Sequence, residues 1–384
     1  MQYRSIGKTG MSASIIGLGA EHLDNKPYEI VEEVIGAALE HGINIFDVFM
    51  PGTPVREHIG KALKGGRKNV LIQGHIGSVD LKQQYDISRD VPTCQKYFEE
   101  LLRCLGTDYI DFGMMFFVDT EQDFRDVFET GYIDYVRQLK QEGKIRAIGA
   151  SSHSPEIAMR LVETGEVELL MFSVNLAYDM LPANVYIVDT LMSEEKIDRS
   201  IFQGIEPRRA RLYELCASRD VAITTMKTLG SGKLLSADHT PFAKPMTVAQ
   251  CIHYALSRPA VVSALLGCKS REEVLETVKY LEMTDAQRDY SGIAETMREI
   301  FLGKCVYCNH CQPCPADLDI AAITKYHEIA MLDPSNIPPG VRAHYNNLPH
   351  HASECTECGF CESRCPFSVA VIENMRLAAK MLEK

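Results

Sequence analysis

Two runs of cysteines near the end of the chain carry the clearest chemical signal in this sequence. Eight of the thirteen cysteines fall in these runs, each closed by Cys-Pro: Cys305, Cys308, Cys311 and Cys314, then Cys355, Cys358, Cys361 and Cys365. Three cysteines at two-residue spacing wrap one [4Fe–4S] cluster, and the fourth reaches the other cluster. We therefore predict two [4Fe–4S] clusters, one on Cys305, Cys308, Cys311 and Cys365, the other on Cys355, Cys358, Cys361 and Cys314.

Two other interpretations of these cysteines stay open. A pair of zinc sites would use the same Cys-x-x-Cys pairs but leaves the third cysteine and the Cys-Pro ending unexplained. The clusters could also be structural rather than electron carriers. The first run is one residue shorter before its last cysteine, so the exchange of ligands between clusters is less firmly indicated than the clusters. The remaining thiols have no paired spacing and are expected to be buried: Cys94, Cys104, Cys216, Cys251 and Cys268.

The elements before the cysteines alternate between short apolar runs and longer amphipathic segments, as in repeated βα units. The eight strand-like runs are 15–18, 43–46, 70–73, 110–115, 147–149, 169–172, 222–225 and 262–266. Helical periodicity is clearest from Tyr28 to Leu39, and 124–139 is expected to form a helix too. The pattern predicts an α/β fold, a (β/α)₈ TIM barrel over 1–300, followed by a small ferredoxin-like domain over 301–384. Chemistry in such barrels sits at the carboxyl ends of the strands.

Other segments and the composition limit the function classes. Residues 1–14 read as a hairpin that could plug the barrel bottom, and 175–207 fits no βα unit. The net charge of −12 is spread along the chain without a basic stripe, which argues against nucleic acid as a partner. No apolar run approaches the length of a membrane span, and no signal peptide is visible. We expect a cytoplasmic protein of an anaerobic cell, since exposed clusters are oxygen-sensitive.

Several stretches resemble the aldo-keto reductases. Residues 3–10 look like their N-terminal hairpin, 46–47 with 59–63 like their second βα unit, and 143–151 like their fifth strand. The whole chain is similar to the branch of that family with a C-terminal 4Fe–4S ferredoxin domain, with 204–207 and 225–235 as further matches. The resemblance implies a barrel that passes a hydride from NAD(P)H to a carbonyl.

The catalytic tetrad of that family is largely missing here. Of its tyrosine, lysine, aspartate and histidine, only Asp47 has a match: Phe49-Met50 follows it, Gly74-His75 stands at the lysine, and Phe116-Phe117 at the histidine. Asp47 and His75 lie at the same ends of neighbouring strands, about 4.8 Å apart in a sheet. We predict that His75 transfers a proton and Asp47 orients it, the alternative being a structural pair. Lys227 could supply positive charge to a substrate or phosphate, while His153 is expected to be a loop residue.

Candidate phosphate-binding loops follow the last two strands. Gly230-Ser231-Gly232 and Gly267-Cys268-Lys269-Ser270 lie where loop amides and a helix N-terminus can hold a phosphate. By the resemblance, Gly267, Lys269 and Ser270 would bind the adenosine end of the dinucleotide and Ser151 the nicotinamide. Glu273 stands where arginine or glutamine is commoner, which puts a preference for NADP in doubt. Because hydride carries two electrons and a cluster accepts one, a flavin such as FMN is a less favoured alternative.

The leading hypothesis is an iron–sulfur oxidoreductase that couples a small organic substrate in the barrel, with NAD(P), to electron transfer through the clusters. A ferredoxin-like redox partner is expected. Two alternatives remain: an electron-transfer protein in which a degenerate barrel is only a docking platform, and a non-redox lyase or isomerase using Asp47 and His75. The sequence leaves the substrate and the direction of electron flow open.

Overall fold

The structure is a computed structural model that describes residues 1–81, 84–182, 185–193, 195, 197–202, 204–294 and 301–383. The chain divides into two compact units. The first consists of 1–173, 221–226 and 262–279, and the second of 174–220, 227–261 and 280–384. Segments 174–220 and 227–261 therefore group with the cysteine region, while the division expected at residue 300 stays a prediction.

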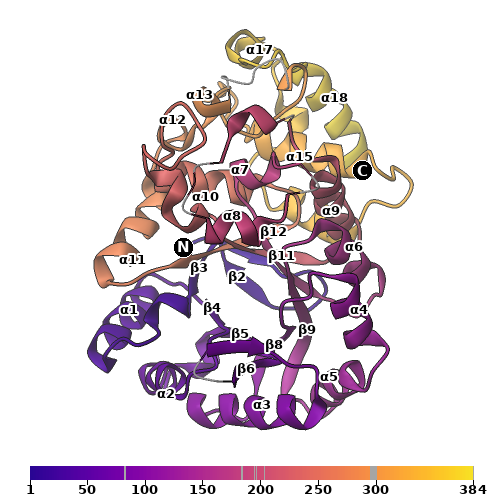
Figure 1. Ribbon diagram of the computed structural model, residues 1–384. Helices are drawn as coiled ribbons and strands as arrows, with labels where there is room; N and C mark the ends of the chain where they lie inside the picture. The colour runs from indigo at the N-terminus through magenta and orange to yellow at the C-terminus, as the bar shows by residue number, and fades with distance from the viewer. Residues whose placement is uncertain are drawn as a thin grey trace. The chain divides into compact units, whose positions relative to one another are not determined.

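The first unit contains a closed barrel of eight parallel strands in the order β10-β11-β12-β3-β4-β5-β8-β9 (Figure 1). Their bounds are β3 Ile16–Gly19, β4 Ile45–Val48, β5 Leu71–Ile76, β8 Ile110–Met115, β9 Ile145–Ser152, β10 Leu169–Ser173, β11 Ala222–Met226 and β12 Val261–Gly267. Each expected strand is present within two residues of its predicted start, so the barrel prediction is confirmed. The strands read as continuous apolar runs because helices cover their outer faces.

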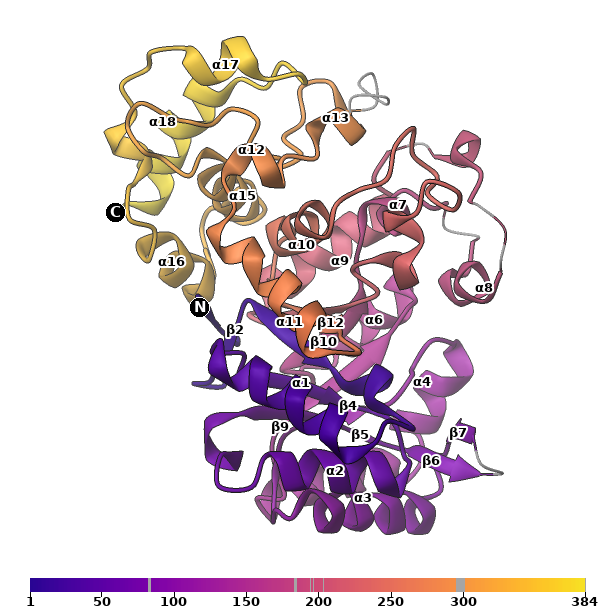
Figure 2. The same cartoon turned by 90° about the vertical axis from the view of Figure 1, so that its left-hand side faces the viewer.

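The helices of this unit lie outside the strands, as Figure 2 shows for α1, α2 and α3. Their bounds are α1 Tyr28–Glu40, α2 Thr53–Ala62, α3 Val91–Leu105, α4 Glu121–Phe128, α5 Tyr132–Gln141, α6 Pro155–Glu163 and α11 Arg271–Val278, with 3₁₀ turns η1 Ala20–Leu23 and η2 Arg67–Asn69. The single helix expected over 124–139 is wrong. The chain breaks between α4 and α5 at Glu129-Thr130-Gly131, where Thr130 caps back onto the Asp126 carbonyl instead of continuing the helix.

Two antiparallel hairpins complete the first unit. Strands β1 Tyr3–Ser5 and β2 Ser12–Ser14 form the expected N-terminal hairpin. Its residues Ile6, Met11 and Ala13 belong to the same buried cluster as side chains from the barrel strands, which fits the plug role. The second hairpin, β6 Ser78–Leu81 and β7 Gln84–Ile87, follows β5 and was not foreseen.

The second unit is helical. Its elements are α7 Leu176–Asp179, α8 Ile187–Met192, η3 Arg199–Ile201, α9 Pro207–Ser218, η4 Gly230–Leu235, α10 Val248–Ser257, η5 Lys279–Glu282 (whose first residue belongs to the first unit), α12 Asp285–Arg288, α13 Ser291–Ala294, α15 Ile320–Ala330, α16 Pro339–Asn346, η7 Ala352–Glu354, α17 Phe360–Arg364 and α18 Val371–Leu382. Helix α15 packs against α16 and α18 (Figure 2). Within the described residues, no helix is long and apolar enough to cross a membrane.

Candidate functional site

Asp47 and His75 meet at the carboxyl ends of two neighbouring barrel strands. In the β4–β5 register Asp47 is opposite Gln73, so His75 lies one inward-facing position further along β5. His75 Nε2 lies 2.8 Å from Asp47 Oδ1, and Gln73 Nε2 donates to the same oxygen at 3.2 Å. Both side chains of the pair are almost fully buried. The structure thus brings together the aspartate and histidine selected from the sequence.

Aromatic rings surround His75. The centroids of the Phe49 and Phe116 rings lie 6.1 Å and 5.2 Å from that of the imidazole, and both rings stand edge-on to it. Tyr85, from the unforeseen hairpin, contacts Phe49 and Phe116 in turn. His75 Nδ1 is buried and has no hydrogen-bond partner among the residues that the structure describes. Since Nε2 is held by Asp47, Nδ1 is the nitrogen left to exchange a proton with a ligand.

A second aspartate–histidine pair lies after the next two strands. Asp119 follows β8, and His153 follows β9 directly. His153 Nδ1 lies 2.9 Å from Asp119 Oδ2, while the His153 backbone N–H and the Ser152 hydroxyl donate to Oδ1 at 2.6 Å and 3.0 Å. His153 lies in the loop that follows β9, and its imidazole is buried and paired with Asp119. Asp119 was missed because a lone aspartate after a strand has no distinctive spacing.

Ser151, expected near the nicotinamide, is hydrogen-bonded to the backbone of the loop after β8. Its Oγ accepts from the Phe117 backbone N–H at 2.8 Å, and its carbonyl accepts from Val118 N–H at 2.9 Å. Met171 and Met226, on neighbouring strands β10 and β11, belong to the buried cluster of the barrel. The barrel interior is consequently more apolar here than the resemblance implies.

The loop after β11 has an unusual backbone. Lys227, Gly230, Ser231 and Gly232 all have positive φ, at 58°, 57°, 55° and 86°. For lysine and serine this conformation is uncommon, and such turns make concavities of backbone N–H groups that bind anions. A Cβ on Gly232 would stand in open space, so glycine is favoured there by the positive φ and not by close neighbours. The Lys227 carbonyl accepts from Asn175 Nδ2 at 2.8 Å, which holds the start of the loop.

The loop after β12 is shaped by packing and by acid groups. A Cβ on Gly267 would collide with the ring of His22, so a close approach requires glycine there. Ser270 caps α11 by accepting from Glu273 N–H at 3.4 Å. Glu273 reaches back, and its Oε2 accepts from the Lys269 N–H at 2.7 Å. A carboxylate thus occupies amides that a phosphate would otherwise use.

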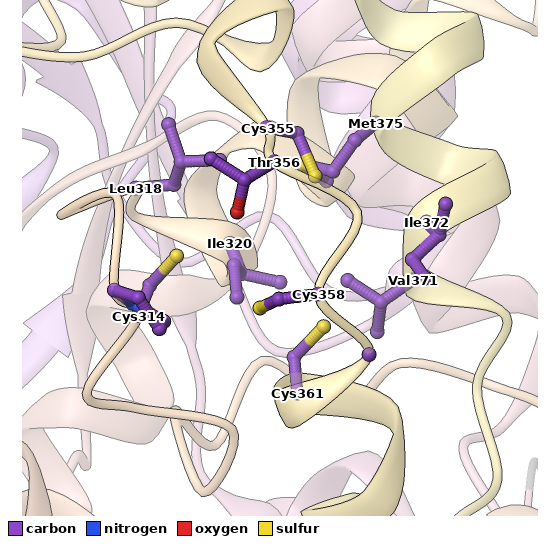
Figure 3. Close-up of a pocket in the computed structure, with 12 residues that line it drawn as sticks. Cys314, Leu318, Ile320, Cys355, Thr356, Cys358, Cys361, Val371, Ile372 and Met375 are labelled. Carbon is purple, nitrogen blue, oxygen red and sulfur yellow. The ribbon is translucent and has the colours of Figure 1, made fainter.

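Four cysteines from both runs line one hollow that is partly open to solvent (Figure 3). Cys314, from the first run, faces Cys355, Cys358 and Cys361 from the second. Apolar side chains make up much of the remaining wall: Pro315, Leu318, Ile320, Val371, Ile372 and Met375. The structure therefore brings one thiol of the first run beside three of the second, and the predicted exchange of ligands stays a prediction.

The other predicted set gathers in a more buried place. Burial raises the pKa of Cys305 well above its usual range, and the charges of Glu328, Cys308 and Cys311 add to the effect. Burial also raises the pKa of Cys308 to about 12, with Cys365 among the nearby charges that contribute. Thiols that are costly to ionise in the protein alone are the groups that a bound cation would stabilise as thiolates.

The segment between Cys305 and Cys308 is anchored to α10. Arg258, which follows α10, is buried and donates from Nη2 to the Val306 carbonyl at 2.7 Å. Its guanidinium also lies over the Tyr307 ring, 4.8 Å from the centroid. The Tyr290 hydroxyl donates to the same Val306 carbonyl. These contacts fix the first cysteine turn to α10 within the second unit.

A single-ion site is not formed. Across the described parts of the chain, no three His, Cys, Asp or Glu side chains stand close enough to hold one metal ion. Four irons and four sulfides fill more space than one ion, so the ligands of a cluster stand wider apart. The five other thiols are all buried, as expected: Cys94, Cys104, Cys216, Cys251 and Cys268. Burial raises the pKa of Cys94 and Cys268 to about 11, which makes them poor nucleophiles.

Comparison with known proteins places the barrel in a family. Residues 15–250 match the model of the Aldo/keto reductase family, a match that ends before the cysteine runs. The chain is 28% identical over 298 residues to L-galactose dehydrogenase of Arabidopsis thaliana, covering 72% of this chain and 87% of that protein. It is 25% identical over 327 residues to NADH-specific methylglyoxal reductase of Escherichia coli, covering 77% and 97%.

Solved structures agree on the fold. The holo form of an aldo-keto reductase from Bacillus halodurans superposes with a TM-score of 0.58 at 20% sequence identity, covering 75% of this chain and 94% of that one. An aldo-keto reductase described as putative, from Pseudomonas aeruginosa, gives a TM-score of 0.55, also at 20% identity, covering 73% and 95%.

Proposed function

The chain belongs to the aldo/keto reductase family and is an oxidoreductase, and from this premise we propose that it is an iron–sulfur enzyme. In this proposal the barrel binds a small carbonyl substrate, and two [4Fe–4S] clusters exchange electrons with a ferredoxin-like partner. The observation that carries the proposal is the hollow in which Cys314 faces Cys355, Cys358 and Cys361. Cys314 is separated in sequence from the other three, so the fold rather than local spacing brings the four thiols together.

The cysteines divide into two ligand sets in this proposal. Cys314, Cys355, Cys358 and Cys361 hold one cluster, and Cys305, Cys308, Cys311 and Cys365 hold the other. Support for the second set comes from its mutual electrostatic contacts and burial. Bound clusters supply one-electron chemistry. The third cysteine of each run and the Cys-Pro endings favour clusters over zinc sites, which would use only the Cys-x-x-Cys pairs.

The proton chemistry of the barrel falls to His75. Its Nε2 is held by Asp47, which fixes the ring orientation, and its Nδ1 is buried without a partner. A positioned acid of this kind contributes about 10²–10⁴ in rate, which replaces the missing family tyrosine. Because the aromatic rings of Phe49 and Phe116 shield the imidazole, a substrate reaches Nδ1 only when these rings turn aside. In this proposal Lys227 supplies positive charge to a substrate oxygen or a phosphate.

The cofactor proposed for the barrel is NAD rather than NADP, with FMN less favoured. The family uses nicotinamide nucleotides, and one relative of this chain is an NADH-specific enzyme. At the end of β12, the Glu273 carboxylate disfavours a further phosphate on the ribose.

The test is a comparison of electron sources under anaerobic conditions. Methylglyoxal and L-galactose, taken from the names of the relatives, serve as first substrates, the former for reduction and the latter for oxidation. We expect methylglyoxal reduction with reduced methyl viologen to exceed that with NADH alone. Viologen-reducible iron without turnover of any carbonyl substrate would instead favour an electron-transfer protein with an inactive barrel. Turnover with the clusters kept oxidised would favour a lyase or isomerase.

A further inference from the structure

The barrel mouth holds two histidines that are built in the same way. Asp47 near the end of β4 orients His75 near the end of β5, and Asp119 after β8 orients His153 after β9. Both carboxylates are buried, and both imidazoles use one ring nitrogen on their aspartate. In His153 that nitrogen is Nδ1, so Nε2 is left for another partner. The strand order places β5, β8 and β9 side by side, so the two pairs occupy neighbouring positions on one rim.

Asp119 is held more firmly than a packing role needs. Three donors converge on its carboxylate: the imidazole Nδ1, the His153 backbone N–H and the Ser152 hydroxyl. The backbone bond and the side-chain bond to one residue fix both the position and the ring orientation of His153. Such support from neighbouring groups is what a residue that transfers protons requires.

A strained residue separates the two imidazoles. Phe117 has φ of 52°, a conformation that is uncommon for a bulky residue. It is retained by hydrogen bonds: its N–H donates to Ser151 Oγ at 2.8 Å, and Arg89 Nη2 donates to the carbonyls of Phe116 and Phe117 at 2.5 Å and 3.3 Å. The bend sends consecutive rings to different partners. Phe116 packs on His75, and Phe117 packs on His153 with centroids 5.0 Å apart.

We propose that Asp119 and His153 form a second proton-transfer pair that serves the same substrate as Asp47 and His75. The inference rests on the function proposed above and deepens it. Reducing a carbonyl to an alcohol consumes two electrons and two protons: the C=O π bond breaks, and one O–H and one C–H bond form. Hydride brings both electrons and one hydrogen together, so a hydride enzyme needs one acid. Electrons that arrive singly from a ferredoxin-type or viologen donor bring no hydrogen, so both protons come from the protein.

In this scheme each histidinium gives up one proton and is recharged from water. One histidine protonates the carbonyl oxygen and the other the carbon, so neither needs to reload within a turnover. Asp47 and Asp119 are positioning residues, because they act through their imidazoles. The substrate class this arrangement suits is a small carbonyl compound that can lie against the aromatic rings and reach both nitrogens.

The test compares His153→Gln and Asp119→Asn with wild type, using methylglyoxal and reduced methyl viologen. We expect His153→Gln to lower the viologen-driven kcat by about 10²-fold or more and to remove one ionisation from its pH profile. Asp119→Asn keeps the ring and the shape, and it should shift that ionisation. Any NADH-driven rate should depend on His75, because a hydride enzyme needs one acid. The exposed His239, bonded to Ser236, provides the matched control His239→Gln.

A viologen-driven rate and pH profile unchanged in His153→Gln would overturn the second pair. If neither viologen nor NADH supports turnover by the wild type, the proposed function fails. The pair is then tested by ¹⁵N spectra of histidine-labelled whole protein titrated with hydroxyacetone. Shifts of both the His75 and His153 ring nitrogens would support a shared ligand site. Shifts of only one, or of neither, would contradict it.

Discussion

At the scale of single residues, the hydrogen bond between His75 Nε2 and Asp47 Oδ1 is the central feature of the barrel site. We predict that His75→Gln lowers carbonyl turnover by about 10²–10⁴-fold, because the glutamine cannot carry the transferred proton. Asp47→Asn should cost less and shift the pH profile, since the imidazole stays but loses its orienting charge. Steady-state kinetics on anaerobic protein checks this, with His239→Gln as the control. Equal turnover in His75→Gln and wild type would show that the pair is only structural.

Cofactor choice is also decided by one residue. Glu273 places its carboxylate on the Lys269 N–H, where an adenosine phosphate would compete for the same donor. We predict that NADH binds at least about tenfold, ~1.4 kcal/mol, more tightly than NADPH. Glu273→Arg should reverse or abolish this difference. Fluorescence titration of the bound nicotinamide measures it.

The matched control is Glu276→Arg, which makes the same charge change on the exposed side of the same helix, where Glu276 pairs with Lys279. If Glu276→Arg alters the preference as much as Glu273→Arg does, general charge rather than the local contact decides the choice. Tighter binding of NADPH to the wild type would refute the prediction outright.

How much of the site was predictable depends on what each residue signals alone. Asp47 and His75 could be selected because both end a recognisable strand run, and neighbouring parallel strands bring their ends together. Asp119 and Tyr85 could not. Asp119 lies in a loop whose path depends on the bend at Phe117, and Tyr85 reaches the mouth from a hairpin whose short strands have no distinctive pattern.

At the scale of elements, helix α15 contains a histidine whose ring nitrogens have no hydrogen-bond partner among the described residues. His327 is buried, and neither ring nitrogen has a partner among the described residues. Burial lowers the pKa of His327 below the usual 6.5 because the charged ring is poorly solvated there. Between the two pKa values the unfolded chain binds more protons than the folded one. The free energy of unfolding therefore falls as pH drops through 6.5 toward the lowered pKa.

We predict that His327→Leu raises the free energy of unfolding by about 1 kcal/mol at pH 7.5, since two unpartnered nitrogens are removed. The gain should be larger at pH 5.5, where wild type pays the cost of keeping the ring neutral. Urea midpoints at the two pH values measure both, with the exposed His239→Leu as control. A gain that is the same at both pH values would mean that His327 does not titrate in this range.

The elements were predicted well where periodicity decides them and poorly where one residue decides them. The eight strand runs were visible because a strand covered by helices must be apolar throughout. The break between α4 and α5 was missed because the apolar period continues across it, and only the Thr130 back-bond and Gly131 stop the helix.

At the scale of the whole molecule, the proposed clusters each draw on both cysteine runs. Cys314 of the first run lines one hollow with Cys355, Cys358 and Cys361 of the second. We predict that Cys358→Ser and Cys308→Ser each remove about half of the iron, measured by iron analysis and by the spectrum of the reduced protein. The buried, unpaired Cys94→Ser should retain all of it. Full iron content in both ligand variants would reject the assignment.

The division of the whole chain was the feature least accessible to sequence. The cysteine runs mark a separate chemistry, yet α9 and α10 group with them in the second unit. One contact that joins them is the Arg258 guanidinium, which follows α10, donates to the Val306 carbonyl and lies over the Tyr307 ring. The partners are far apart in the sequence, so no residue spacing indicates this contact.

The most direct test of the central claim is the iron, acid-labile sulfide and zinc content of anaerobically purified protein, with bound nucleotides released by acid and identified. We expect about eight irons and eight sulfides per chain and no stoichiometric zinc. Among any bound nucleotides we expect nicotinamide rather than flavin. Zinc at one or two per chain with no iron would contradict the central claim, and so would an iron-free protein that reduces carbonyls with NADH alone.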